Sequence, residues 1–403
     1  MTKKPSYRFT GYTEVWEEKK LGNLGSVEMC RRIFKEETSA EFEIPFFKIG
    51  TFGGEADTYI TREKFEEYKT KFAYPQRGDL LLSASGSIGR VVEYDGDEAY
   101  YQDSNIVWLN HHGKINNKFL KAFYKIVSWS GIEGTTIKRL YNKNILETDI
   151  SLPSLPEQTA IGSFFRDIDQ LISLQQRKLE VLKEQKKTYL KLLFPAKGQT
   201  KPALRFAGFE DDWKEVKLGE VGETYTGLSG KTKEDFGHGE GKFITYVNVF
   251  NNPLTDLYRL DSVEIDDKQR RVQYGDVLFT TSSETPEDVG LSSVWMGTED
   301  NVYLNSFCFG YRPQKGIFDL YYLAFVLRSF SVRKEFMLLA QGISRFNISK
   351  TKVMDMSIHV PSLPEQEAIG SFFQDLDKAI AKQEEKANQL KESKQTLLRK
   401  MFI

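Results

Sequence analysis

Residues 152–169 read LPSLPEQTAIGSFFRDID, and residues 360–377 read VPSLPEQEAIGSFFQDLD. The two stretches agree at 14 of 18 positions, and each opens a long charged segment that contains neither glycine nor proline beyond its first turns. Each is preceded by about one domain's length of mixed sequence. The chain is therefore predicted to be a tandem duplication of a globular unit followed by a long helix.

The start of each predicted helix carries a capping signal. Ser154 and Glu157, like Ser362 and Glu365, have the S-x-x-E spacing of a capping box, in which hydroxyl and carboxylate accept from free amides of the first turn. The proline before each glutamate falls inside that first turn, where a missing N–H costs little. The repeated stretch therefore marks a helix N-terminus in both copies.

Apolar residues follow each start at alternating steps of four and three, flanked by Glu and Lys. This 3.5-residue period runs for about five heptads, which is typical of a coiled-coil seam, and Gln or Lys interrupts it at the same two places in each copy. A helix docked on a domain surface gives a similar pattern, but the length and the repeated polar breaks favour the coiled coil. The predicted seam consists of Ile161, Phe165, Ile168, Ile172, Leu179, Leu182 and Leu193 in the first helix, and Ile369, Phe373, Leu376, Ile380, Leu390 and Leu397 in the second.

Chain connectivity favours an antiparallel pair. The first helix ends near Phe194, and the second globular unit starts a few residues later and must finish where the second helix begins. Parallel helices would oblige that unit to carry the chain back along about 50 Å of helix at 1.5 Å per residue. We therefore expect antiparallel packing with an approximate twofold axis and a globular unit at each end of a rod.

The globular units share a frame. RFTGYTEVWEEKKLGNLG from residue 8 matches RFAGFEDDWKEVKLGEVG from residue 205, so the second unit is 11 residues longer than the first. The linker FPAKGQTKPAL from residue 194 separates them. The predicted boundaries are residues 1–153 for the first domain, 154–195 for the central helix, 196–361 for the second domain and 362–403 for the C-terminal helix.

Each unit mixes strands with helices. Short β-like runs include GDLLLSAS from residue 78 and GDVLFTTSS from residue 275. Alternation before each long helix predicts a further strand, over Leu146, Thr148, Ile150 and Leu152 in one copy and Met354, Met356, Ile358 and Val360 in the other. The fold class is therefore α+β. Residues 50–58 and 247–255 have little mutual similarity, so one scaffold is expected to present different loop surfaces.

Composition sets limits on partners and location. The 403 residues include 56 Lys and Arg against 57 Asp and Glu, so a polyanion would have to meet local patches. Cys30 and Cys308 lie at unrelated places in the repeats and indicate two reduced thiols. The sequence has neither a signal-peptide pattern nor a long apolar run, which predicts a cytoplasmic protein that uses no membrane.

Catalytic motifs fail on inspection. GLSGKT from residue 227 resembles the end of a phosphate-binding loop, but Tyr225 stands where the leading glycine is required. The four histidines show no ligand spacing, so no metal site and no catalytic residue are predicted. A binding architecture remains. Two globular units that have different loops and are held a fixed distance apart suit a bipartite, asymmetric duplex target, because major-groove faces recur every ~34 Å.

The repeated PSLPEQ-x-AIGSFF segments, the RF-x-G-[YF] start followed by Trp and Leu-Gly, and the FP-x-x-G-x-T-x-P linker resemble the specificity subunit of type I restriction-modification systems. The resemblance covers both halves of the chain. It implies two target recognition domains, an antiparallel helical spacer that sets the gap between half-sites, and no catalysis by this chain. It also implies two modification subunits that use S-adenosylmethionine, and restriction subunits that use ATP and Mg. One alternative is a coiled-coil tether with two protein-binding heads and no DNA specificity. The other is a self-contained restriction or methylation enzyme, which would need the catalytic motifs that fail above.

Candidate DNA contacts lie in two loops of each unit. Lys and Arg there would neutralise phosphates, and Asn and hydroxyl groups would contact bases or backbone, although an ordinary solvated turn has the same composition. The divergent loops are the expected place for base choice. The candidates are Lys138, Arg139, Asn142, Lys143, Ser83, Ser85, Ser87 and Arg90 in the first unit, and Arg345, Asn347, Lys350, Lys352, Thr281 and Ser283 in the second.

Overall fold

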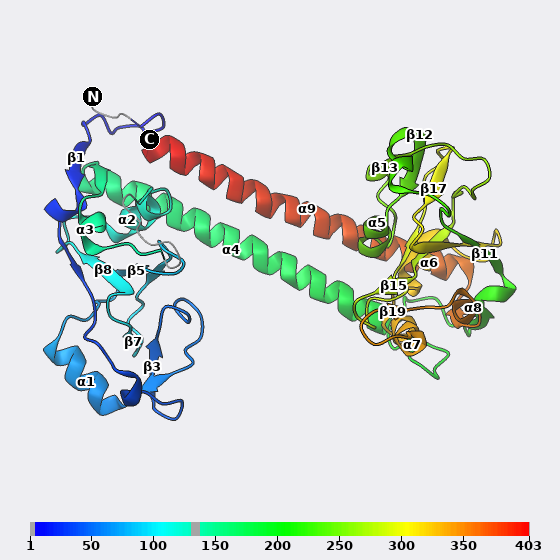
Figure 1. Ribbon diagram of the computed structural model, residues 1–403, viewed down its shortest axis with the longest axis horizontal. Coiled ribbons are helices and arrows are strands. Elements are labelled where there is room, and N and C mark those ends of the chain that lie inside the picture. The colour runs from blue at the N-terminus through cyan, green and yellow to red at the C-terminus, as the bar shows by residue number, and fades with distance from the viewer. Residues whose placement is uncertain (1–4, 130–137, 403) are drawn as a thin grey trace. The chain divides into compact units, whose positions relative to one another are not determined.

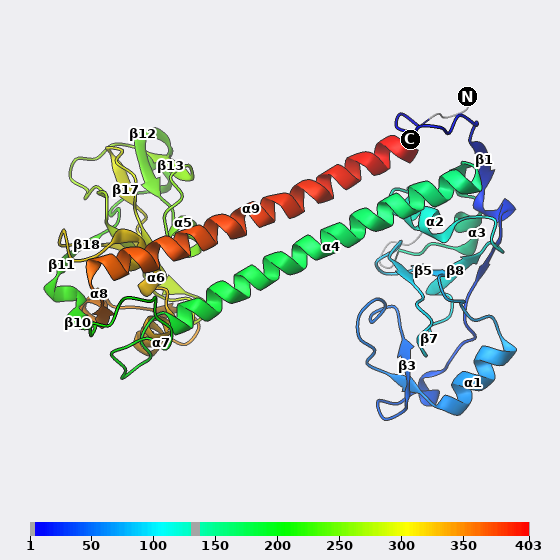
Figure 2. The ribbon, with the colours of Figure 1, turned by 180° about the vertical axis from the view of Figure 1, so that it is seen from behind.

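A computed structural model describes residues 5–129 and 138–402 (Figure 1). The chain folds into two compact units. The first is Met1–Gln176 together with Lys386–Ile403, and the second is Arg177–Glu385. Each unit therefore contains a segment of both long helices, α4 (Leu155–Leu192) and α9 (Leu363–Phe402). The last turns of α9 belong to the first unit, beside the first turns of α4 (Figures 1 and 2).

The first unit contains a four-stranded antiparallel sheet of order β2-β8-β5-β6, a three-stranded sheet of order β4-β3-β7 in which β3 and β7 are parallel, and the pair β1-β9. Its elements before α4 are β1 (Glu17–Lys20), η1 (Leu21–Asn23), β2 (Ser26–Glu28), η2 (Lys35–Glu37), β3 (Ile44–Phe47), β4 (Tyr59–Ile60), α1 (Arg62–Lys71), β5 (Leu80–Ser83), β6 (Val91–Glu93), β7 (Tyr100–Tyr101), β8 (Ile106–Asn110), α2 (Asn117–Tyr124), α3 (Asn142–Leu146) and β9 (Asp149–Leu152).

The second unit repeats this topology, with sheets β11-β18-β14-β16, β13-β12-β17 and β10-β20, and adds the short pair β15-β19. Its elements before α9 are β10 (Lys214–Lys217), η3 (Leu218–Glu220), β11 (Gly222–Thr226), η4 (Lys233–Asp235), β12 (Phe236–Ile244), α5 (Tyr246–Asn251), β13 (Leu260–Val263), β14 (Val277–Thr280), β15 (Ser282–Ser283), β16 (Ser292–Val294), β17 (Val302–Leu304), β18 (Cys308–Pro313), α6 (Leu320–Val326), α7 (Phe330–Leu339), β19 (Phe346–Asn347), α8 (Lys350–Met354) and β20 (Ser357–Val360).

The strands before the long helices are shorter than the alternation predicts. β9 and β20 contain Ile150 and Ile358, but Leu146 ends α3 and Met354 ends α8. The Thr148 hydroxyl donates to the Asn144 carbonyl oxygen (2.8 Å) and so closes the end of α3. The first half of each alternating run therefore belongs to a helix end and a turn, because local hydrogen bonds there replace strand pairing.

The glutamates of the repeated stretch do not cap their helices as predicted. Glu157 is fully buried, and its carboxylate accepts from the Arg8 guanidinium (2.6 and 2.7 Å) and from Trp16 Nε1 (3.2 Å). Glu365 likewise accepts two bonds of 2.7 Å from Arg205. Each carboxylate therefore ties the leading segment of its unit to the start of the long helix, and bidentate charge-assisted geometry makes this a strong link.

In both units the long helices run antiparallel to each other. In the first unit Lys394 of α9 pairs with Asp169 of α4, and in the second unit Lys186 of α4 pairs with Asp377 of α9 (2.6 Å). These lysines are the polar interruptions of the predicted seam, and each meets a carboxylate of the other helix. All the predicted seam positions are buried or half-buried.

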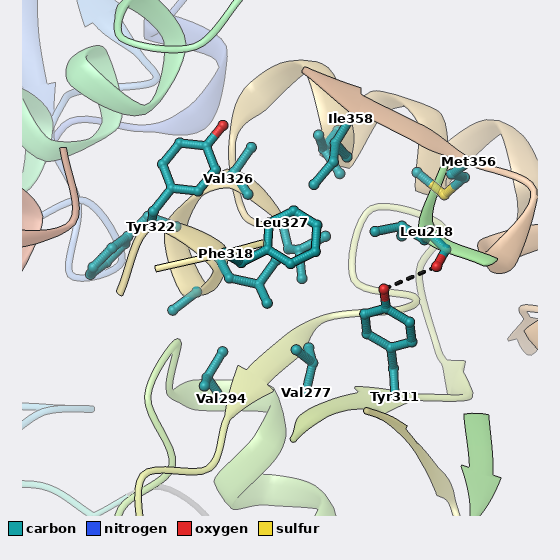
Figure 3. Close-up of a cluster of buried hydrophobic side chains, with 14 of the residues drawn as sticks. Leu218, Val277, Val294, Tyr311, Phe318, Tyr322, Val326, Leu327, Met356 and Ile358 are labelled. Atoms are coloured by element: carbon teal, nitrogen blue, oxygen red, sulfur yellow. Dashed lines mark hydrogen bonds between the residues drawn. The ribbon is translucent and has the colours of Figure 1, made fainter. Parts of the chain in front are cut away.

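The helix ends are also part of the domain cores. Ile161 and Phe165 pack with Leu398 and Met401 in the core of the first unit, and Ile369 and Phe373 lie in the core of the second. In that second core the Tyr311 hydroxyl donates to the Leu218 carbonyl oxygen (3.0 Å), as Figure 3 shows. Among the described residues, no helix combines the length and the apolar character needed to span a membrane.

Candidate nucleic-acid interface

Two candidate loops of the first unit are cross-linked through their backbones. Ser85, after β5, forms a bridge with Arg139, and the Leu140 N–H donates to the Ala84 carbonyl oxygen (2.8 Å). The loop that follows β5 and the segment that leads into α3 therefore form one surface, although they are more than 50 residues apart in the sequence.

The second unit has the same cross-link. Ser282 of β15 pairs with Asn347 of β19, and the Ile348 N–H donates to the Thr281 carbonyl oxygen (3.0 Å). These bonds join positions equivalent to those of the first unit, so both domains build the candidate surface on one backbone framework.

The divergent segments reach the same surfaces. In the first unit, Arg90 Nη1 donates to the Phe52 carbonyl oxygen (2.6 Å), which fixes residues 50–58 to the loop after β5. In the second, the Tyr246 hydroxyl, at the start of α5, donates to the Ser282 carbonyl oxygen (2.6 Å). The divergent segment of the first unit thus meets the cross-linked loops, and in the second unit the residue directly before the divergent segment does so.

Several predicted contact residues in the first unit have structural partners. Ser83 and Ser85 are buried; the Ser83 hydroxyl donates to the Ser87 carbonyl oxygen (2.5 Å), and the Ser85 hydroxyl donates to Asn105 Oδ1 (2.8 Å). These two serines therefore shape the loop and are not free to contact a ligand. Ser87 and Arg90 remain exposed beside them.

The cations of the first unit differ in accessibility. Lys138 is exposed, whereas Arg139 is half-buried, with its guanidinium 5.8 Å from the Tyr141 ring centroid. Asn142 and Lys143 belong to α3, which packs against η1 and β2. Lys138 and Arg139 consequently adjoin the loop after β5, while the α3 pair belongs to a separate element.

The second unit carries its exposed polar groups on a hairpin. Arg345 and Asn347 are exposed, and Gln341 and Asn347 exchange two backbone hydrogen bonds (2.9 and 2.8 Å). Thr281 and Ser283 are half-buried, and the Thr281 hydroxyl donates to the Phe307 carbonyl oxygen (2.8 Å). The hairpin is thus held next to the loop after β14.

Lys350 and Lys352 lie on α8, which packs against η3 and α7. Lys352 lines a cavity of about 710 Å³ together with linker residues 194–198. The α8 lysines therefore border a different surface from the hairpin.

Sequence reasoning missed two positions on these surfaces. Asn105 directly precedes β8, and Phe307 directly precedes β18, the equivalent strand. The Ala84 N–H donates to the Asn105 carbonyl oxygen (2.8 Å), and the Thr281 N–H donates to the Phe307 carbonyl oxygen (3.0 Å). A comparison of the repeats strand by strand, in place of motif by motif, would have found this pair.

Groups that resemble reactive sites have other partners. Lys231, in the GLSGKT segment, forms an ion pair with Asp266 (2.9 Å). Burial raises the pKa of the Cys30 thiol to about 12, which keeps it protonated and unreactive.

The sequence matches the family described as type I restriction modification DNA specificity domain twice, over residues 13–184 and residues 210–392. The chain belongs to the type I restriction-modification DNA specificity family. Each of the two family matches spans one globular domain and most of the long helix after it. DNA sequence recognition is the function that this family implies.

Curated members of this specificity family are similar to the chain. A type I restriction enzyme specificity subunit of Haemophilus influenzae is 51% identical over 152 residues, which are 38% of this chain and 40% of that protein. The MjaVIII specificity subunit of Methanocaldococcus jannaschii is 25% identical over 348 residues, which are 80% of this chain and 74% of that protein. The first match thus spans less than half of the Haemophilus protein.

Solved structures share the fold of this specificity-family chain. The type I restriction-modification S subunit from M. genitalium aligns over 99% of both chains with a TM-score of 0.56 and 16% identity. A chain from a structural study of complex assembly and conformational transition of the type I R-M system aligns over 98% of this chain and 99% of its own, with a TM-score of 0.58 and 18% identity.

Proposed function

We propose that the chain is the DNA-specificity subunit of a type I restriction-modification complex and that it recognises a bipartite, asymmetric duplex target. Each unit reads one half-site with the surface formed by the loop after β5 or β14, the segment cross-linked to it and the adjoining divergent segment. The length of the α4–α9 pair sets the number of base pairs between the half-sites.

One observation carries this proposal: equivalent backbone hydrogen bonds in the two units hold different side chains. The bonds from Leu140 to Ala84 and from Ile348 to Thr281 are the same link, yet Arg139 and Asn347 occupy the equivalent bridge positions. A shared framework with unlike contact groups is what two half-sites of different sequence require.

The partners follow from this role. Two modification subunits would bind the chain and supply the chemistry of S-adenosylmethionine, and restriction subunits would supply the chemistry of ATP and Mg. The chain itself would contribute recognition and scaffolding and no catalytic residue, which accords with the absence of a complete catalytic motif from the sequence.

Methylation-sensitive sequencing of the host genome, followed by gel shifts with the chain assembled on its modification partner, tests the proposal. The sequencing should return a motif of two unlike half-sites with a fixed gap, and duplex binding should require both half-sites. Replacing residues 1–153 by those of a relative should change one half-site only.

Deleting one heptad from both α4 and α9 tests whether the helix pair sets the gap between the half-sites. The half-sites should stay the same while the gap changes or assembly fails. If the assembled chain shows no sequence-specific duplex binding at low salt, the proposal is wrong, and the tether with two protein-binding heads becomes the better explanation.

A further inference from the structure

Phe307 is an aromatic side chain left exposed on the candidate surface of the second unit. The residue is 55% exposed, and the Arg345 guanidinium lies 6.0 Å from its ring centroid. Its carbonyl oxygen accepts from both the N–H (3.0 Å) and the hydroxyl (2.8 Å) of Thr281. The backbone is therefore fixed while the ring faces solvent beside the hairpin.

The equivalent residue of the first unit has the opposite chemistry. Asn105 receives the same backbone bond, from Ala84, and its amide oxygen accepts from Ser85 Oγ (2.8 Å). One framework position thus carries a polar amide in the first unit and an apolar ring in the second. This difference lies next to the cross-linked loops, where the proposed function locates base choice.

The hairpin beside Phe307 adds a second apolar group and a cation. Two backbone bonds between Gln341 and Asn347 close it, and Ile343 at its tip is 98% exposed. Arg345 of the same hairpin extends over the Phe307 ring and provides a positive charge that attracts the phosphate backbone. The surface of the second unit therefore combines apolar contact area with a local cation.

In the major groove the apolar group of a base pair is the C5-methyl of thymine, which apolar side chains such as Phe contact. We infer that Phe307 packs against the C5-methyl group of a thymine in the half-site read by the second unit. This inference rests on the proposed function and specifies one base and one atom within it.

The test replaces thymines by deoxyuridine, one at a time, in a duplex carrying the identified target, and measures affinity for the chain assembled with its modification partner. Exchange of residues 1–153 shows which half-site belongs to the second unit. Replacing one particular thymine of that half-site by deoxyuridine should weaken binding of the duplex about fourfold. This is the effect expected for the loss of one buried methyl group at about 0.8 kcal/mol. With the Phe307→Ala variant, the same replacement of thymine by deoxyuridine should leave the affinity for the duplex unchanged.

Phe330→Ala is the matched control. Phe330 is 49% exposed on α7, and Lys334 Nζ lies 4.6 Å from its ring centroid, so it resembles Phe307 in exposure and in having a cation over the ring. This variant should keep the full response to deoxyuridine. Thermal unfolding of both variants checks that each is folded.

The outcomes separate the two proposals. If the wild-type complex binds its target but no thymine of this half-site responds, or if Phe307→Ala keeps the response, the inference about Phe307 is wrong while the proposed function stands. If the wild-type complex binds no specific duplex at all, both are wrong.

Discussion

Trp16 and Trp213 occupy equivalent buried positions in the two units, and one hydrogen bond distinguishes them. Trp16 Nε1 donates to the Glu157 carboxylate (3.2 Å), whereas Trp213 Nε1 has no hydrogen-bond partner within residues 5–129 and 138–402. Their exposed fractions, 5% and 4%, are nearly equal. The chain therefore contains its own control for the contribution of this bond.

Trp16→Phe should destabilise the first unit more than Trp213→Phe destabilises the second, by about 1 kcal/mol. Both substitutions remove the same ring atoms, but only the first removes a bond to a carboxylate. Hydrogen exchange in peptides covering β1 and β10 measures the opening free energy of each unit separately. Equal losses in the two variants would show that the Trp16 bond contributes nothing.

The role of Glu157 marks a limit of sequence reasoning at this scale. The Ser-x-x-Glu spacing located both helix starts, because α4 begins at Leu155 and α9 at Leu363. It could not show that the carboxylate accepts from Arg8, because that partner is 149 residues away along the chain. The Ser-x-x-Glu spacing is the same whether the glutamate caps its own helix or pairs with an arginine far away in the sequence. The spacing alone therefore cannot distinguish the two.

At the scale of elements, Lys394, which interrupts the apolar seam of α9, forms an ion pair with Asp169 in which the lysine is more deeply buried than the carboxylate. The Lys394 side chain is 9% exposed and that of Asp169 is 39% exposed, and Lys125 also donates to Asp169 (2.7 Å). Removing Asp169 would leave a buried cation without its carboxylate, whereas removing Lys394 would leave Asp169 paired with Lys125.

Asp169→Ala should therefore destabilise the helix pair of the first unit by about 1–3 kcal/mol. Lys394→Met fills the seam with an unbranched apolar chain and should change the stability by less than about 1 kcal/mol. Hydrogen exchange in peptides covering residues 386–402 reports the difference. A larger loss from Lys394→Met than from Asp169→Ala would contradict this account of the pair.

The same pair predicts a response to acid. Burial alone would raise the pKa of Asp169, but hydrogen bonds from Lys125 and Lys394 outweigh it and hold the pKa below the ordinary 3.8. The stabilisation from this carboxylate is therefore present above about pH 3.8 and is lost as the pH falls through the lowered pKa. Unfolding measured from pH 6 to pH 3 should show a smaller acid-linked loss in Asp169→Asn than in the wild type.

At the scale of the whole molecule, each unit is completed by a helix segment that is distant in sequence. Leu398 is fully buried in the core of the first unit, beside Phe165 and Met401. Its counterpart on α4, Leu190, is only half-buried against the core of the second unit. At this position the first unit therefore buries more of the long helix that ends in it than the second unit does.

Leu398→Ala should destabilise the first unit by about 2–5 kcal/mol, because it opens a cavity in a close-packed core. Leu190→Ala should cost the second unit less, since part of that side chain already faces solvent. Hydrogen exchange in peptides from β5 and β14 separates the two effects. Faster exchange in β14 than in β5 for the Leu398 variant would contradict the assignment of this residue to the first core.

Sequence reasoning recovered the duplication, the α+β class and the antiparallel helices, because each leaves a repeated or periodic pattern. It recovered less of the candidate interface. Ser83 lies in a hydroxyl-rich loop that looks available in sequence yet is buried, and Phe307 lies in no motif at all. Accessibility depends on which strands bring segments together, and the 3.5-residue period of the helices carries no information about that.

The contribution of Leu398 and Met401 to the first core has a consequence for biosynthesis. A ribosome makes residues 5–129 well before Leu398 and Met401, which complete the core of the first unit. Until then Trp16 and Phe165 lack part of their native packing. A nascent first domain would therefore expose apolar side chains to which chaperones can bind. The core of the first unit can therefore be completed only after the residues of the second unit have been synthesised.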